Sequence, residues 1–209
     1  MFINTLPATA RQLLTRLGQE LLIRPFYLAG GSAVALYLGH RVSVDLDFFT
    51  HRDDYEVEPL TQQLRAIGRL NVQQQARGTL IGLLAGVRVS FFAYPYLLLA
   101  EPTELDGVQI AHLLDIALMK LIAISQRGTK RDFIDLYFIC QHGYRLDELL
   151  PRVPEKYQTV SYSSYHLLRA LAYFADAEED EPPEMLVSFN WNEVKRFFEG
   201  EVRRLMQQL

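Results

Sequence analysis

Two short segments of this sequence carry residue types that together could handle a phosphorylated ligand. The first is Gly30-Gly31-Ser32, which follows the apolar run at 26–29 and precedes a helix-like pattern. A strand, two glycines and a helix start let backbone N–H groups approach a phosphate closely, and the positive end of the helix dipole favours the anion. Two glycines before a helix are more often only a turn that needs positive φ, so this segment alone is a weak indication.

The second segment is the acid pair Asp45 and Asp47, which lies on a strand predicted at 44–49. A strand has a side-chain period of 2, so both carboxylates are expected on one face. Neighbouring carboxylates repel each other, and Mg²⁺ or Mn²⁺ would neutralise them. The alternatives are an exposed strand face or salt bridges to Arg41 and Arg52. Together with the glycine turn, the pair predicts one pocket for nucleotide phosphates and their metal.

The first part of the chain alternates helix and strand patterns, which predicts a mixed α and β core at 1–102. Pro25 ends the first helix, and Ser32 is expected to be the N-cap of the second. Glycines separate the later strands. The expected elements are a helix at 8–23, strands at 26–29 and 44–49, a helix at 56–67, and strands at 70–76, 79–84 and 87–94.

After Pro102 no strand pattern is expected, and apolar residues recur at helical spacing. This predicts a helical lobe at 103–209, with helices at 113–125, 131–142, 164–174 and 191–206. The short link between the first two predicts an antiparallel hairpin, and the acidic stretch at 178–184 predicts a solvated connector. The expected fold class is α/β (α+β), with a mixed sheet and a C-terminal helical lobe.

Composition sets wider bounds on the function. Of 209 residues, 49% are hydrophobic and 22% charged, and no apolar run reaches the roughly 18 residues of a membrane span. The net charge of -4 argues against a broad footprint on duplex nucleic acid. A lone cysteine, Cys140, and the lack of a signal-like start favour the cytoplasm. Histidines and cysteine show no zinc-ligand spacing.

The stretch YLAGGSAVALYLGHRVSVDLDFFT, residues 27–50, resembles the signature of AbiEii-like nucleotidyltransferases of the DNA polymerase β superfamily. The resemblance implies a polymerase-β-type core with a split sheet, Mg²⁺ or Mn²⁺ on Asp45 and Asp47, and transfer of a nucleoside monophosphate from a nucleoside triphosphate. The residues that it implies at the nucleotide in this segment are Gly30, Gly31, Ser32, His40, Arg41 and Ser43.

A second stretch, LLDIALMKLIAISQRGTKRDFIDLYFI, residues 113–139, resembles the later motif of the same family. Lys120 stands on an almost wholly apolar helix, so its ammonium needs a partner. That partner is either the nucleotide phosphates or Asp135 across the hairpin. Arg131, Asp132 and Asp135 share one arc of their helix, expected to face the site. The resemblance implies that Asp132 or Asp135 assists the acceptor and that Arg131 contacts the nucleotide. The alternative without a functional role is a surface ion pair between Arg131 and Asp135.

One residue departs from the pattern of the superfamily. In GVRVSFFAY, Ser90 stands where many of these enzymes carry a third carboxylate. The expected activity is Mg²⁺-dependent transfer from a nucleoside triphosphate to an RNA (tRNA-like) or protein acceptor, by a toxin of a toxin–antitoxin or phage-defence system with an antitoxin partner. The alternative is a catalytically silent nucleotide-binding protein of the same fold that recruits a partner.

Overall fold

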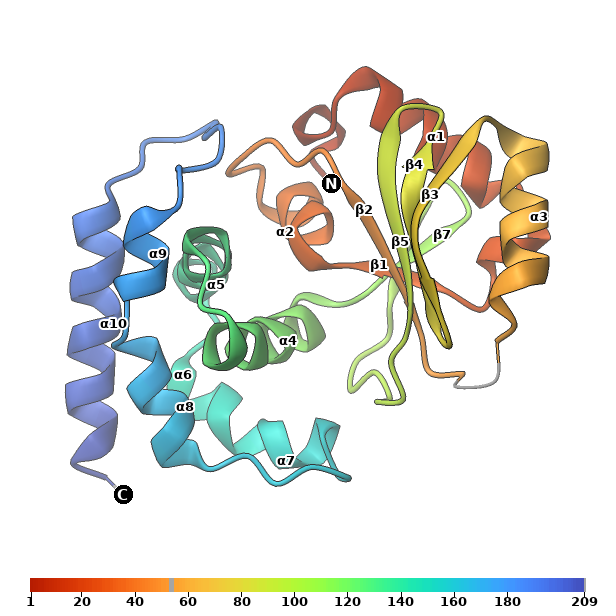
Figure 1. The fold of residues 1–209 in the computed structure, drawn as a ribbon. Coiled ribbons are helices and arrows are strands. Elements are labelled where there is room, and N and C mark those ends of the chain that lie inside the picture. The colour runs from red at the N-terminus through yellow and green to blue at the C-terminus, as the bar shows by residue number, and fades with distance from the viewer. Residues whose placement is uncertain (53–54, 209) are drawn as a thin grey trace.

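The computed structural model describes residues 1–52 and 55–208, in which one mixed sheet stands beside a group of helices (Figure 1). The sheet has seven strands in the order β3-β4-β5-β2-β1-β7-β6. At its centre, β2 (Leu46–Thr50) runs antiparallel to β1 (Tyr27–Ala29) and parallel to β5 (Val87–Ala93). The edge is built by β3 (Leu70–Ala76) and β4 (Thr79–Leu84). The mixed α/β fold expected from the sequence is confirmed.

The sheet continues beyond Pro102, so the expectation that strands end there is wrong. Two three-residue strands, β6 (Thr103–Leu105) and β7 (Val108–Ile110), form a hairpin, and β7 pairs in parallel with β1. Asp106 and Gly107 make the turn with φ of 51° and 82°. An Asp-Gly pair is a strong hairpin signal, but strands of three residues are too short to show an alternating pattern.

One face of the sheet is covered by α1 (Ala8–Gly18) and α3 (Val57–Ile67). The rings of Phe48 and Phe91 stack beneath them with centroids 5.0 Å apart, both fully buried. The first helix ends at Gly18, earlier than the expected residue 23, and a 3-10 turn, η2 (Leu21–Ile23), follows. A Cβ on Gly18 would lie 1.9 Å from the carbonyl oxygen of Asp106, so the helix ends where it meets the hairpin.

The helical lobe is centred on the hairpin of α4 (Leu113–Gln126) and α5 (Lys130–Gln141), which packs against α2 (Gly30–Leu38). The long helix α10 (Trp191–Met206) lies on the outer side (Figure 1). The shorter elements are η1 (Ile3–Thr5), α6 (Leu146–Leu149), η3 (Leu150–Arg152), α7 (Val153–Lys156), α8 (Ser164–Leu171) and α9 (Ala175–Glu179). Among the described residues, none of the helices is both long and apolar enough to span a bilayer.

The stretch at 178–184 is mostly exposed, as expected of a connector, but it is anchored at both ends. The carboxylate of Asp180 accepts a hydrogen bond of 2.9 Å from the backbone N–H of Lys130, at the start of α5. The carbonyl of Glu184 accepts one of 2.8 Å from Val42. The connector therefore fastens the loop before β2 to the helical lobe.

Candidate functional site

The turn at Gly30 brings the start of α2 directly against Asp47. Gly30 has a φ of +66°, and a Cβ there would lie 3.1 Å from Oδ2 of Asp47. Any larger residue would therefore be strained in its backbone and crowded by the carboxylate. The first backbone N–H groups of a helix have no acceptor within the helix, so this end of α2 can bind an anion.

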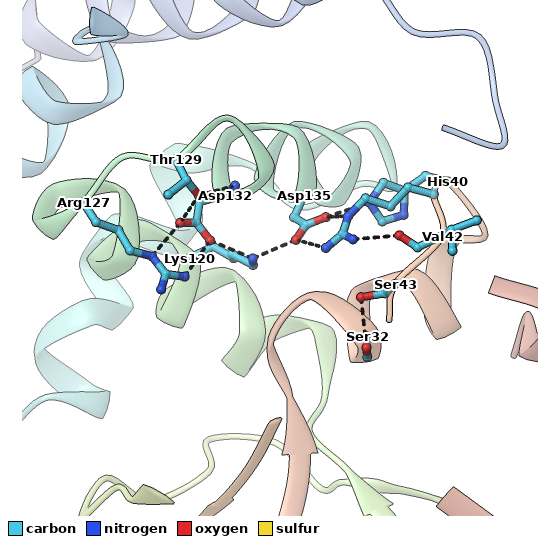
Figure 2. Close-up of polar contacts among 10 residues, drawn as sticks. Ser32, His40, Val42, Ser43, Lys120, Arg127, Thr129, Asp132 and Asp135 are labelled. Atoms are coloured by element: carbon cyan, nitrogen blue, oxygen red, sulfur yellow. Dashed lines mark hydrogen bonds and ion pairs between the residues drawn. The ribbon is translucent and has the colours of Figure 1, made fainter. Parts of the chain in front are cut away.

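Ser32 lies in the first turn of α2 and is not its N-cap, since the helix already begins at Gly30. The strand runs straight into the helix through the positive φ of Gly30, and this moves the helix start three residues earlier than expected. The buried Ser32 hydroxyl contacts Ser43 Oγ at 2.9 Å and donates to the backbone carbonyl of Asp45 (Figure 2 shows the Ser43 contact). Ser32 thus fixes the backbone of the acid pair relative to the start of α2.

The two carboxylates lie next to each other at the edge of this turn. Asp45 comes immediately before β2, and Asp47 lies in β2 between Ala29 and Ser90 of the neighbouring strands. Burial raises the pKa of Asp47, the hydroxyl of Ser90 lowers it, and the charge of Asp45 raises it further. Arg88 Nη1 approaches Asp45 Oδ2 at 3.9 Å, but the Arg88 side chain is half-exposed.

This donor set fits a divalent cation. Two adjacent carboxylates leave negative charge that the weak contact with Arg88 compensates poorly, and hard cations such as Mg²⁺ prefer carboxylate oxygens. Within residues 1–52 and 55–208 no cluster of three or more His, Cys, Asp or Glu side chains has the arrangement of a metal site. The described residues thus offer two carboxylates at this place, so the remaining ligands would come from substrate or water.

Asp135 of α5 is the centre of a buried ionic cluster that joins the loop before β2 to the hairpin of α4 and α5 (Figure 2). Arg41 binds it with two hydrogen bonds, from Nε at 2.7 Å and from Nη2 at 2.9 Å. Lys120 Nζ lies 2.7 Å from Oδ2, and His40 Nε2 lies 2.8 Å from Oδ1. Although burial raises the pKa of Asp135, the charges of Arg41 and Lys120 outweigh it and hold that pKa well below its usual range.

Asp132, one turn earlier on α5, binds a second set of partners. Lys120 Nζ contacts it at 2.9 Å, and Arg127 contacts it at 2.9 and 3.2 Å. The Thr129 hydroxyl donates a bond of 2.7 Å. Burial raises the pKa of Asp132, but the charges of Lys120 and Arg127 lower it to about 2. Lys120, which is 6% exposed, therefore bridges both aspartates, so the pairing with Asp135, one of the two partners considered for it, is present.

The guanidinium of Arg41 contacts both Asp135 and the start of α2. A Cβ on Gly31 would lie 2.2 Å from Nη2 of Arg41 and 3.5 Å from Oγ of Ser43. The guanidinium thus packs on the backbone of Gly31, where no side chain fits. A phosphate bound at this helix start would meet both backbone N–H groups and a fixed positive charge.

Two of the residues expected at the nucleotide, His40 and Arg131, have opposite surroundings. His40 is 1% exposed and its ring packs against Phe138 with centroids 5.0 Å apart, behind Asp135. Arg131 is exposed, whereas Asp132 and Asp135 on the same helix are buried. The ion pairs of Arg127 with Asp132 and of Arg88 with Asp45 were not expected. The second depends on a strand pairing that residue spacing does not reveal.

The seven-stranded mixed sheet and the helix start beside an acid pair define an α/β protein of the nucleotidyltransferase class. The chain belongs to the AbiEii family: residues 12–205 match the family model described as nucleotidyl transferase AbiEii toxin of type IV toxin–antitoxin systems. The chain is therefore a nucleotidyltransferase.

One sequence relative and two solved structures of similar fold show how far the similarity extends. The uncharacterized protein aq_aa25 of Aquifex aeolicus is 39% identical over 186 residues, which cover 87% of this chain and 88% of that protein. A Helicobacter pylori protein provisionally assigned as a nucleotidyltransferase has a similar fold, with a TM-score of 0.58 at 17% identity over 100% of this chain and 96% of that one. JHP933 from Helicobacter pylori gives a TM-score of 0.52 at 16% identity, over 96% and 90% of the two chains.

Proposed function

We propose that this chain transfers a nucleoside monophosphate from a nucleoside triphosphate to an acceptor hydroxyl. The acceptor is a tRNA-like RNA or a protein. The observation that carries this proposal is the contact between Gly30 and Asp47, because it puts an anion-binding helix start beside the acid pair. Membership of a toxin family supports action as a toxin with a separately encoded antitoxin, in the cytoplasm where nucleoside triphosphates are made.

The residues around this contact suit distinct roles. The backbone of Gly30 and Gly31 would bind triphosphate oxygens, with Ser32 and Ser43 fixing the turn. Asp45 and Asp47 would hold Mg²⁺ or Mn²⁺, which when bound supplies charge neutralisation and polarisation of the phosphates.

Lys120 and Arg41 would balance the charge that develops on the transferred phosphoryl group. Asp132 and Asp135 are saturated by cations, and a carboxylate with a pKa of about 2 is a weak base at neutral pH. These contacts therefore favour a role for Asp132 and Asp135 in positioning Lys120, Arg41 and Arg127. They do not favour proton transfer from the acceptor to either aspartate.

The remaining predicted contacts have clear places in this scheme. His40 would orient Asp135 from behind, since it touches that carboxylate and not the start of α2. Arg131, exposed on α5, would contact the nucleotide or the acceptor from the solvent side.

A second candidate function rests on Ser90. This serine pairs with Asp47 at the position where many polymerase-β-type enzymes carry a third carboxylate. With only two carboxylates, the chain would bind nucleotide but not turn it over. It would then act as a binding subunit that recruits a partner.

Incubation with each α-labelled nucleoside triphosphate and total cell RNA or lysate tests the proposal. Transfer predicts a labelled RNA or protein band with the wild type and no band with Asp45→Asn plus Asp47→Asn. Binding of nucleotide without any labelled acceptor would instead support the silent subunit.

A further inference from the structure

The sheet face that carries Asp47 also carries three aromatic side chains in contact with one another. We call Phe49, Phe92 and Tyr94 the aromatic row. The ring centroid of Phe49 lies 5.4 Å from that of Phe92 and 5.5 Å from that of Tyr94. All three are partly exposed, and Phe49 also stacks on the buried ring of Tyr27 at 6.0 Å.

The opposite face of the same strands is fully covered. Phe48 and Phe91, the neighbours of Phe49 and Phe92 in sequence, are 0% exposed on the face that packs beneath α1 and α3. Sheets with one open face normally present polar residues to solvent on it. On the side of Asp47, Phe49 and Tyr94 pack against the hydrophobic core, and Tyr94 also contacts Tyr157. All three rings nevertheless keep partial exposure beside ionic groups, where a bound ligand can reach them.

The strand register orders the groups on this face. Ala29 pairs with Asp47 and Tyr27 pairs with Phe49, while Gly30 follows Ala29 directly. The start of α2, the acid pair and the aromatic row therefore follow one another in a line. Asp47 and Phe49 are two residues apart on a strand, which separates their side chains by about 7 Å. The triphosphate, ribose and base of a nucleotide follow one another in the same order and on a comparable scale.

We propose that the aromatic row binds the base of the incoming nucleoside triphosphate by stacking. The proposal rests on the proposed function, since the start of α2 and the acid pair must hold the triphosphate for the base to reach Phe49. Phe49 and Phe92 offer ring faces without hydrogen-bonding groups, and the Tyr94 hydroxyl is engaged with that of Tyr157 at 2.6 Å. Because every base has an aromatic face, the row contributes affinity for all four nucleotides and little discrimination between them.

Isothermal titration of nucleoside triphosphate and of inorganic tripolyphosphate, each with Mn²⁺, tests this subsite without an acceptor. The wild type should bind each nucleoside triphosphate more tightly than tripolyphosphate. Phe49→Leu should weaken nucleotide binding by about tenfold, the size of one lost stacking contact, and leave tripolyphosphate binding unchanged. Phe49→Tyr, which keeps the ring, should restore nucleotide binding. Phe92→Leu should act in the same direction and serves where Phe49→Leu does not fold.

The outcomes separate this proposal from the proposed function. Nucleotide affinity within twofold of the wild type in both leucine variants, or an equal loss for nucleotide and tripolyphosphate, would overturn the base subsite alone. A loss of RNA binding with intact nucleotide binding would assign the row to the acceptor and overturn the proposal. A wild type that binds neither ligand would overturn the proposed function and this subsite together.

Discussion

Replacing Asp135 by asparagine removes a buried carboxylate that neutralises two buried cations. Arg41 is 4% exposed and Lys120 is 6% exposed, and both contact Asp135. Removing one partner of a buried ion pair costs about 3–5 kcal/mol, because the other charge stays buried without compensation. The free energy of unfolding of a domain is about 5–15 kcal/mol, so Asp135→Asn should remove a large share of the stability.

The arrangement predicts a smaller effect when Lys120 is the residue removed. In Lys120→Met, Asp132 keeps Arg127 and Asp135 keeps Arg41. No carboxylate is stranded, so the cost should be about 1–3 kcal/mol, the range for lost hydrogen bonds to charged groups. In the double variant, loss of the lysine relieves the excess positive charge left by Asp135→Asn. The double variant should therefore lose less stability than the sum of the losses in the two single variants. The difference should be about 1 kcal/mol or more.

Urea unfolding at pH 7, followed by circular dichroism and by the fluorescence of Trp191, measures all three variants. The expected order of destabilisation is Asp135→Asn first and Lys120→Met second, with coupling in the double variant. Equal costs for the two single variants, or costs that simply add, would refute the view that Asp135 is the shared counter-ion of Arg41 and Lys120.

Three further predictions follow from the same contacts. Lys120→Met, where folded, should lower the single-turnover rate of transfer by about 100-fold or more, and a near-normal rate would remove Lys120 from the catalytic residues. Ser90→Asp should raise Mn²⁺ affinity because a third carboxylate would join Asp47, and an unchanged titration would contradict that placement. The pKa of Asp132 falls from 3.8 to about 2 on folding, so its ionised form stabilises the fold above pH 4 by about 2 kcal/mol, and this is lost as the pH falls towards 2. The stability difference between wild type and Asp132→Asn should therefore shrink between pH 4 and pH 2, and a difference independent of pH would contradict the assignment.

The parts of the fold that follow from local pattern were predictable from the sequence. The alternation in β2 correctly separated Asp47 from its apolar neighbours, because a strand has a fixed period of 2. The hairpin of α4 and α5 correctly brought Lys120 to Asp135. The strands at 103–110 were missed, since three residues carry too little periodicity and only Asp106-Gly107 marks the turn.

The ionic cluster was predictable only in part. Arg41 and Asp135 are 94 positions apart, and their bidentate pairing depends on how α5 packs against the loop before β2. Nothing in residue spacing encodes that packing. Asp132 and Asp135 of the predicted arc on α5 are buried, but angular position does not say where the buried arc ends, so Arg131 at its margin is exposed. The roles of these residues in transfer stay predictions.

Nucleotidyl transfer from the site at Asp45 and Asp47 is tested most directly by following both ends of the triphosphate in one reaction. Parallel incubations with acceptor RNA or lysate would use nucleoside triphosphate labelled at the α or at the γ phosphate. The account predicts that wild type transfers the α label to an acceptor and releases the γ label as pyrophosphate, and that Asp45→Asn plus Asp47→Asn, folded as judged by circular dichroism, does neither. Transfer of the γ label, or undiminished α transfer by the double variant, would contradict it.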